Sequence, residues 1–418
     1  MKIGEIRMEG SGGAIRAAAD VTWEDSDRPT REIFFEIESP GELRTPSPDA
    51  FLAALAVPAL HGGERRIAVH GTVCPRMRDG VVGVCRLLRS WHAELGAAPA
   101  IEPSGGFRAP WPAPAGQTGL FLSGGVDSLY TLAENRRDYP AAHPRAMRHA
   151  IFVRGLMMPF EGTRDMVEDI DRRALPRVAR LAAAAGLMLS TVRTNLGLAL
   201  DEHAAYAHLW AGAFLAAIAH LFTERLSRVT IASSHDLVHG LIPWGTDPLL
   251  ETRLSTGATE IDHSGIRATR LAKIREVGRW NAALEALVVC GESPLPGPHP
   301  NCGRCEKCVR TRAGLLAAGR LAEAVTFPDA PLDAAAIATV QPANPHVFPY
   351  FWDDMVEPLR AAGRPDLADA VSARCRREMD ARAWHADSGW KGRLRRIDRR
   401  WFGGRMLRWR RSLGSETA

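Results

Sequence analysis

Residues 123–128 (SGGVDS) combine residue types that are suited to holding a phosphate group. Two adjacent glycines allow positive φ angles and close approach, so that successive amide N–H groups can converge on phosphate oxygens. An apolar strand is expected at 119–122 and an apolar helix at 127–136, which places a helix N-terminus at this loop. We therefore predict that the loop binds the phosphates of a nucleotide, through Ser123, Gly124, Gly125, Val126, Asp127 and Ser128.

Asp127 is an acceptor and cannot donate a hydrogen bond to phosphate. Its expected catalytic role is to position a Mg²⁺ ion carried by the nucleotide. N-capping of the following helix is the competing role, in which case the two glycines form only a tight turn.

Four of the seven cysteines have the spacing C-x11-C-x2-C-x2-C: Cys290, Cys302, Cys305 and Cys308. Thiolates two residues apart can reach one ion around a tight turn, and four thiolates form a closed tetrahedral shell around Zn²⁺. Such a zinc has no open position for water and would be structural. An iron–sulfur cluster or unrelated buried thiols are the alternatives. The other cysteines, Cys74, Cys85 and Cys375, are expected in the core.

Short apolar runs alternate with helical segments after residue 118. Strands are expected at 119–122, 150–153, 187–192 and 229–232, and helices at 127–136, 166–185 and 203–224. This alternation is typical of right-handed β-α-β units around a parallel sheet, so the fold class is α/β. Ligands of such sheets bind at the carboxyl ends of the strands, which points to the loops that follow these four strands.

The chain divides into three predicted parts. Residues 1–112 form an N-terminal α+β accessory domain, with β-rich segments at 32–38 and 66–73 and a helix at 81–95. Gly and Pro punctuate a linker at 102–117. Residues 113–320 hold the phosphate loop, an irregular stretch at 233–265, a helix at 268–277 and the cysteines. Residues 321–418 form a helical extension.

The formal net charge of +5 is spread unevenly. Residues 390–411 hold ten Lys or Arg and one acid, so the remainder of the chain is slightly acidic and is no general nucleic-acid surface. The tail interleaves arginines with aromatic residues: Trp390, Trp401, Phe402 and Trp409. It could stack on nucleobases, lie on an anionic membrane, or pack on the body of the protein.

The N-terminal residues lack the pattern of a secretory signal. The longest apolar stretch, 204–222, contains two histidines and follows two acids, so we expect a buried helix and no transmembrane segment. The expected localisation is cytoplasmic.

The SGGVDS string resembles the signature of the PP-loop ATP pyrophosphatases and differs from a Walker A loop, which ends in Gly-Lys-Ser/Thr. Together with the late cysteines in HPNCGRCEKCVRT, it resembles the 7-cyano-7-deazaguanine synthase branch over residues 117–320. The resemblance implies a parallel-sheet PP-loop domain (HUP-like, Rossmann-type) with a structural zinc. It also implies ATP-dependent adenylation of a deazapurine carboxylate, attack by ammonia to give an amide, and dehydration to a nitrile. Relatives of this synthase occur in antiphage defence gene clusters.

Further residues are predicted at the carboxyl edge of the sheet. The resemblance gives Lys273 a position that faces the phosphates, although a solvated helix face is the simpler reading. Arg154 follows the second strand and either contacts nucleotide or substrate or forms an ordinary salt bridge. Ser233 and Ser234 are candidates for nucleotide binding. For substrate binding the candidates are His235, Asp247 and Arg253; loop capping is the competing reading for the polar residues after the fourth strand.

The predicted function is that of an ATP- and Mg²⁺-dependent, carbon–nitrogen bond-forming ligase. It adenylates a carboxylate, releasing pyrophosphate, and a nitrogen nucleophile then attacks. The acceptor is a small molecule or a macromolecule, and either terminal extension is a candidate surface for a protein partner. Two alternatives remain open: a tRNA-modifying PP-loop enzyme that binds RNA through the basic tail, and a non-catalytic nucleotide-binding partner protein.

Overall fold

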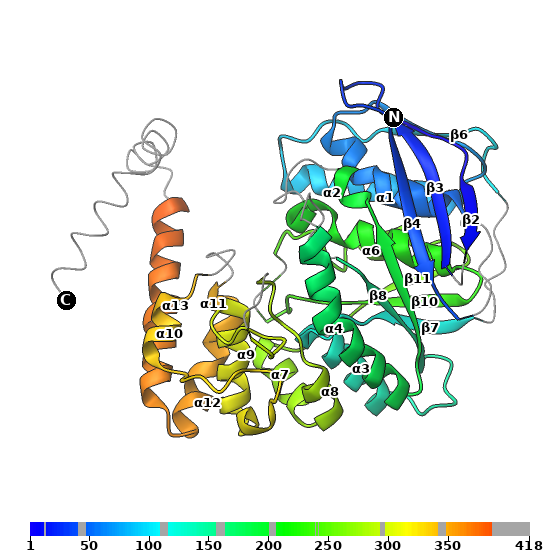
Figure 1. Ribbon diagram of the computed structural model, residues 1–418. Helices are drawn as coiled ribbons and strands as arrows, with labels where there is room; N and C mark the ends of the chain where they lie inside the picture. Colours follow the sequence, from blue (N-terminus) through cyan, green and yellow to red (C-terminus); the bar gives the residue numbers. More distant parts are fainter. Residues whose placement is uncertain are drawn as a thin grey trace.

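A computed structural model describes residues 1–11, 14–40, 47–108, 116–155, 164–199, 206–238, 240, 242–292, 297–341 and 348–386 (Figure 1). Within this part of the chain the strands form one eleven-stranded mixed sheet. Its order is β11-β10-β7-β8-β9-β4-β3-β1-β5-β6, and β2 pairs with β3. The predicted α/β class is confirmed.

The parallel half of the sheet consists of β7 (Gln117–Phe121), β8 (Met147–Val153), β9 (Met188–Thr194), β10 (Leu226–Ala232) and β11 (Glu260–Ser264). All neighbouring pairs in this half are parallel. The four predicted strands are present, and β11 is an addition within the stretch that was expected to be irregular. In chain order the strands are arranged 3-2-1-4-5, so the topology reverses between β7 and β10. Ligands of open α/β sheets bind outside the carboxyl ends of the strands at such a switch point.

The other half of the sheet comes from the N-terminal residues: β1 (Lys2–Ile3), β2 (Arg7–Ser11), β3 (Ala14–Thr22), β4 (Arg31–Glu38), β5 (Arg66–Val69) and β6 (Ala100–Pro103). Strand β4 alternates buried and more exposed side chains, with Ile33, Phe35 and Ile37 in the core. It pairs antiparallel with β9, in the register Phe35↔Thr194. The sheet therefore continues across the predicted domain boundary; residues 109–115 of the predicted linker lie outside the described residues.

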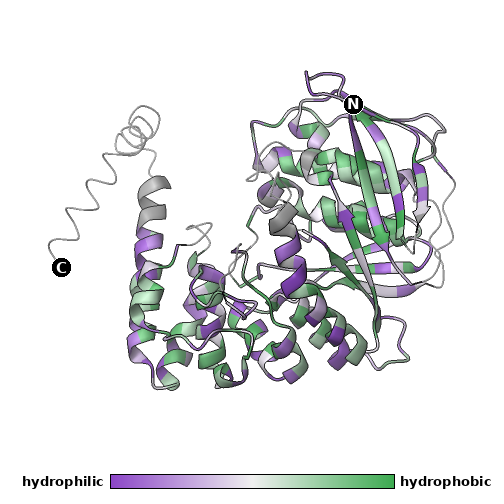
Figure 2. Cartoon of the chain, in the orientation of Figure 1, coloured by the Kyte–Doolittle hydropathy of each residue, from purple (hydrophilic) through white to green (hydrophobic). Residues whose placement is uncertain are grey.

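One face of the sheet is covered by α1 (Pro48–His61), α2 (Pro75–Trp91) and α6 (Ala211–Ala219). A π-turn at Tyr206–Trp210 precedes α6, and a 3-10 turn at His220–Phe222 follows it. Helix α1 is apolar along most of its length (Figure 2) and is buried on nearly every side. The indole Nε1 of Trp210 donates to the Ala54 carbonyl oxygen across 2.8 Å, which joins the π-turn to α1.

The opposite face is covered by α3 (Val126–Asp138) and α4 (Arg164–Ala184). Helix α7 (Arg270–Gly278) packs on α3, α8 (Asn281–Ala286) packs on α4, and α9 (Glu306–Ala317) packs on α7. Alternate residues at the end of β7 and just after it separate the two cores: Phe121 belongs to the first, whereas Leu120 and the following Leu122 belong to the second. Further short 3-10 helices in the described residues are Leu196–Ala199, Glu251–Leu254, Leu321–Glu323 and Asp353–Met355.

The C-terminal helices are α10 (Ala334–Thr339), α11 (Phe348–Trp352), α12 (Val356–Ala361) and α13 (Pro365–Ala386). They pack beside α7 and α9 (Figure 1). Trp352 and Leu359 share one apolar core with Leu271 and Ile274 of α7. The described part of the extension is helical, as predicted, and its helices reach the α7–α9 region, where Lys273 and Cys308 lie.

The basic tail at 390–411, with Trp390, Trp401, Phe402 and Trp409, lies outside the described residues. Of the helices in the part that is described, none combines the length and apolarity that crossing a bilayer requires.

Candidate functional site

The loop at residues 123–128 lies at the topological switch point, between the end of β7 and the start of α3. Gly124 has a φ of +79°, and its carbonyl oxygen accepts a 2.8 Å hydrogen bond from the Val288 amide. A Cβ atom at this position would lie 2.8 Å from the Ala286 carbonyl oxygen. The loop conformation and the close approach of residues 286–288 therefore both require glycine.

The start of α3 has no side-chain cap. The N-cap residue is Gly125, and Asp127 lies inside the first turn, so the competing N-cap role of Asp127 is wrong. The Ser123 hydroxyl accepts from the Gly125 amide at 3.3 Å, and Ser128 Oγ donates to the Gly125 carbonyl oxygen at 3.1 Å. The hydroxyls thus brace the loop, while the positive end of a 13-residue helix stays open to an anion.

Asp127 binds two cationic side chains from α7. Its Oδ1 lies 2.8 Å from the Arg270 guanidinium and 3.2 Å from Lys273 Nζ. Burial opposes ionisation of this carboxyl, but the positive charges of Arg270 and Lys273 outweigh burial and lower its pKa to about 2. Both contacts reach Oδ1, and no further hydrogen bond to this carboxylate is found among the described residues.

Helix α7 places these two cations one turn apart. Its N-cap residue, Thr269, accepts a hydrogen bond from the Ala272 amide, and Arg270 and Lys273 follow with i, i+3 spacing on one helix face. Lys273 is only 1% exposed, and burial lowers its pKa, although Asp127 acts in the opposite direction.

The loop after β10 is held by the same two cations. Lys273 Nζ donates to the Ser233 carbonyl oxygen at 2.5 Å, and Arg270 donates to the Ser234 carbonyl oxygen at 3.0 Å. The main-chain oxygens of Ser233 and Ser234 therefore share these two cations with Asp127, and the nucleotide-binding role of the two serines stays a prediction. The Ser233 hydroxyl instead donates to the His235 carbonyl oxygen at 2.6 Å.

Phe351, an aromatic residue of the C-terminal extension, lies against Arg270 and a further arginine. The guanidinium carbon of Arg270 lies 5.0 Å from the Phe351 ring centroid, and that of Arg310 lies 4.4 Å from it. The His235 ring stacks on the same residue, with centroids 5.4 Å apart. None of Arg270, Arg310 and Phe351 was predicted. The i, i+3 spacing to Lys273 could have indicated Arg270. Arg310 lies within the quoted cysteine motif, on the helix that carries Cys308, whereas Phe351 comes from the C-terminal extension.

Positive charge predominates in this region. The region holds four cationic side chains and three carboxylates that interact with them electrostatically. The cations are Arg270, Lys273, Lys307 and Arg310, and the carboxylates are Asp127, Glu306 and Asp236. The Nε atoms of Arg270 and Arg310 are buried without a hydrogen-bond acceptor in the described part of the chain. Burial lowers the pKa of Arg310 to about 10, still well above neutrality. The cluster, named the cation cluster below, is therefore equipped to hold an anion with several oxygen acceptors.

A small cavity lies beside the cation cluster. Its lining includes Ser233, His235 and Asp247, so the structure brings two of the predicted substrate-binding residues together. His235 also packs edge-on against Trp244, at 5.3 Å between centroids. Burial, followed by the charge of Arg270, lowers the pKa of His235 to about 4, so its imidazole is neutral at pH 7. Burial raises the pKa of Asp247.

Two predicted residues have other surroundings. Arg154 follows β8 and forms an ion pair with Asp171 of α4, with 2.6 Å between Nε and Oδ2. Arg253 is exposed, and its main chain packs closely against Gly80 of α2. A Cβ atom at Gly80 would lie only 1.9 Å from the Arg253 carbonyl oxygen. Neither residue contacts Asp127 or Lys273 through the interactions described here.

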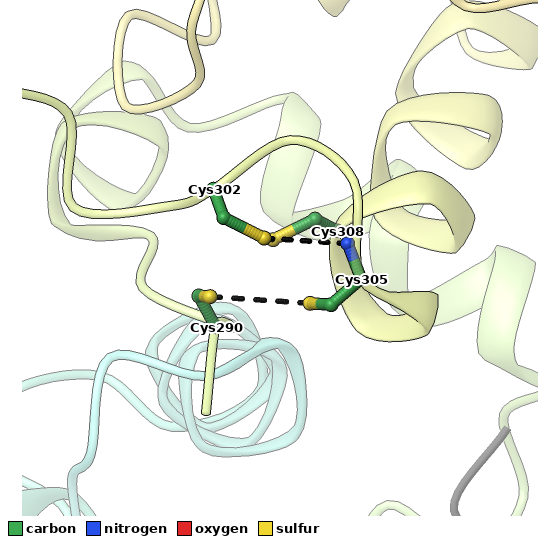
Figure 3. A group of neighbouring side chains, drawn as sticks. All are labelled: Cys290, Cys302, Cys305 and Cys308. Atoms are coloured by element: carbon green, nitrogen blue, oxygen red, sulfur yellow. Dashed lines mark hydrogen bonds between the residues drawn. The ribbon is translucent and has the colours of Figure 1, made fainter. Parts of the chain in front are cut away.

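The four predicted cysteines converge on one point (Figure 3). Their Sγ atoms all lie within 4.8 Å of one another, with 3.9 Å between Cys290 and Cys305 and 3.8 Å between Cys302 and Cys308. A tetrahedron with Zn–S bonds of about 2.3 Å separates its sulfurs by about 3.8 Å. None of the chain's seven cysteines forms a disulfide. The cluster is therefore spaced to hold a metal ion such as zinc.

Hydrogen bonds around the cysteines fix this geometry. The Cys305 amide donates to Cys302 Sγ at 3.2 Å, as backbone amides do around thiolate ligands. Asn301, 1% exposed, accepts from the Val289 and Cys290 amides through Oδ1 and donates to the Leu287 carbonyl oxygen through Nδ2. This side chain ties the distant Cys290 to the other three ligands, a function that no sequence signal indicated.

Comparisons of this chain with family models, with curated proteins and with solved structures found no match. The functional argument therefore depends on the residues of the site.

Proposed function

We propose that the protein is an ATP-dependent ligase of the PP-loop type, which adenylates a carboxylate and releases pyrophosphate. One observation carries the proposal. The start of α3, which has no side-chain cap, follows the Gly124–Gly125 turn at the switch point of the sheet, and Asp127 in its first turn binds Lys273 and Arg270 of the cation cluster. Backbone amides at a helix N-terminus and buried cations are the groups that bind a polyphosphate.

The residues suggest a division of tasks at the nucleotide. The loop would hold the outer phosphates. Asp127 would coordinate Mg²⁺ through Oδ2, and the ion would screen the phosphate charges. Lys273 is buried and cannot move far, so its charge is positioned in advance to offset the negative charge that develops as pyrophosphate leaves.

The acceptor would bind beside His235 and Asp247. The cavity that these residues line has room for about one water molecule, so the site would have to open to admit an acceptor. His235 would contact the acceptor as a neutral imidazole. Its pKa of about 4 makes it a weak base at pH 7, so we assign it a binding role and not proton transfer. We propose a carboxylate acceptor of the deazapurine type or a related one, an amide or nitrile product, and a role in a modification or defence pathway. Nothing in the described residues favours the RNA-modifying or the non-catalytic alternative.

The cysteine cluster would hold a structural zinc through Cys290, Cys302, Cys305 and Cys308. Four thiolates leave no open coordination position, so the ion would stabilise the fold and take no part in bond cleavage. Reduced thiolates of this kind persist in a reducing compartment, which supports a cytoplasmic location.

An exchange assay tests the proposed reaction. Labelled pyrophosphate is incubated with ATP, Mg²⁺ and pools of deazapurine acids, metabolite acids or peptides. Formation of an acyl-adenylate is reversible before the amine attacks, so label should enter ATP only when a true acceptor is present. Asp127→Ala should abolish the exchange. Acceptor-dependent formation of ADP, or equal exchange by Asp127→Ala, would contradict the proposal.

A further inference from the structure

Arg310 and Phe351 form a contact between two parts of the chain that sequence analysis had separated. The guanidinium of Arg310, on α9, lies over the ring of Phe351, on α11, at 4.4 Å. The other cation on this ring is Arg270, which also binds Asp127 at 2.8 Å. One aromatic side chain of the C-terminal extension thus contacts guanidinium groups from both α7 and α9 at the edge of the proposed nucleotide site.

The position of Arg310 is fixed from two further directions. Its NH1 group donates to Glu306 Oε1 at 2.9 Å, and the indole Nε1 of Trp352 donates to the same oxygen at 2.9 Å. Trp352 is fully buried, and Phe348 stacks on it with centroids 5.2 Å apart. Helix α11 is therefore anchored in the core and cannot move independently of α9.

Arg310 retains hydrogen-bonding capacity that the protein does not use. Its Nε atom is buried and has no acceptor among the described residues, and the same is true of Arg270 Nε. A buried donor without a partner costs about 1–3 kcal/mol. The Nε atoms of Arg312, Arg320 and Arg374 are also without an acceptor among the described residues. Arg270 and Arg310, however, share one ring beside Asp127, and it is this pairing that points to an anionic ligand. Glu306 accepts from both Trp352 and Arg310 through Oε1.

We propose that Arg310 binds the pyrophosphate leaving group, and that Phe351 is the positioning residue that holds Arg310 and Arg270 in place for it. The inference rests on the proposed function. As the carboxylate oxygen bonds to the α-phosphorus, the bond from that phosphorus to the bridging oxygen breaks. The electron pair leaves with pyrophosphate, and the guanidinium groups offset the added negative charge.

The inference also connects the cysteine cluster to the proposed nucleotide site. Cys305 is the N-cap residue of α9 and Cys308 lies in its first turn, two residues before Arg310. A metal held by these cysteines would set the start of the helix that carries Arg310.

Calorimetric binding of inorganic pyrophosphate, measured with Mg²⁺ and without ATP, tests the role of Arg310. We expect Arg310→Gln to weaken binding at least 10-fold. The control is Arg275→Gln, which removes an exposed charge from α7 and should change the affinity less than twofold. Equal affinities of the two variants would overturn the proposal for Arg310.

The role of Phe351 is tested by a matched pair on the same short helix. Phe351→Leu should weaken pyrophosphate binding about 3- to 10-fold. Phe351→Tyr keeps the aromatic ring and should bind pyrophosphate as tightly as the wild-type protein. Phe348→Leu disturbs the anchor of α11 without removing the ring from the two arginines, and should retain most of the affinity. An unchanged affinity in Phe351→Leu, or equal losses in both leucine variants, would overturn the positioning role.

The same measurements separate this inference from the proposed function. A wild-type protein that binds ATP and pyrophosphate, together with an Arg310→Gln variant that binds both equally well, would overturn only the inference. A wild-type protein that binds neither ligand would overturn both.

Discussion

Lys273 Nζ lies 3.2 Å from Asp127 Oδ1, although the two residues are 146 positions apart in the chain. The contact joins the first turn of α3 to α7 and fixes a buried ammonium group beside the phosphate loop. The Ser233 carbonyl oxygen, 2.5 Å from the same nitrogen, completes its surroundings. The predictions below start from this arrangement.

Replacing Lys273 should affect the chemical step more than folding. In Lys273→Gln, Asp127 keeps its ion pair with Arg270, so the fold should survive. The charge that would offset the leaving group is lost, and we expect acceptor-dependent AMP formation to fall about 100- to 1,000-fold. Arg275→Gln on the same helix is the charge control. Steady-state rates and thermal unfolding curves check the prediction, and a Lys273→Gln enzyme as active as the control would contradict it.

Gly124 should not tolerate a side chain, because of a close contact as well as its positive φ angle. Gly63 has a similar φ of +74°, but no heavy atom lies within 4 Å of a Cβ built there. Gly63→Ala should therefore cost about 1 kcal/mol of unfolding free energy, the cost of a left-handed residue. Gly124→Ala should cost more and abolish nucleotide binding, because its Cβ would press on the Ala286 carbonyl oxygen. Urea unfolding of both variants measures the difference, and equal costs would show that the close contact is unimportant.

Removing one thiolate of the cysteine cluster should release the metal. We expect one zinc per chain in the wild-type protein, and less than a tenth of that in Cys305→Ser. The unfolding free energy should fall by several kcal/mol, because binding energy of a structural zinc contributes to folding. Cys85→Ala, at a buried thiol outside the cluster, should retain the zinc. Elemental analysis and denaturant unfolding provide the readouts; iron in the purified protein, or full zinc retention by Cys305→Ser, would refute the assignment.

His149 should make the protein less stable in mild acid. Burial, with a smaller contribution from Arg225, lowers the pKa of this fully buried imidazole to about 4, whereas an unfolded histidine titrates near 6.5. The unfolded state thus binds the proton more readily. The contribution is fully present above pH 6.5 and is lost as the pH falls toward 4, amounting to about 3 kcal/mol.

The measurement is the unfolding free energy in urea at pH values from 4.5 to 7.5. His149→Gln keeps a polar group near Ser190 Oγ, which lies 2.8 Å from His149 Nε2, but does not titrate. The variant should lose stability less steeply below pH 6.5. His235, whose pKa is also about 4, should account for part of the remaining slope. Identical slopes in the wild-type protein and in His149→Gln would rule out the buried histidine as a cause.

Local signals allowed the glycine turn between β7 and α3, the cysteine cluster and most of the parallel sheet to be predicted from sequence. In each case the defining residues are close together in the chain: six consecutive residues for the loop, and three cysteines within seven residues. Strand β11 was missed because its sequence, EIDHS, is short and polar. Helix α1 was missed because it is apolar on every side and has no amphipathic period.

The residues that complete the site could not be found in this way. Phe351 contributes only through contacts with α7, α9 and the loop after β10, and nothing in its neighbouring sequence indicates those partners. Arg253 shows the converse error. It was expected near the acceptor because of its position in an irregular loop, but the loop turns its main chain toward α2. Long-range packing decided both positions.

The most direct test of the central claim is to identify which bond of ATP is cleaved. ATP labelled at the α-phosphate is incubated with the protein, Mg²⁺ and an acceptor found in the exchange assay, and the products are separated. The account predicts labelled AMP and free pyrophosphate, with both lost in Asp127→Ala. Labelled ADP with inorganic phosphate would contradict it.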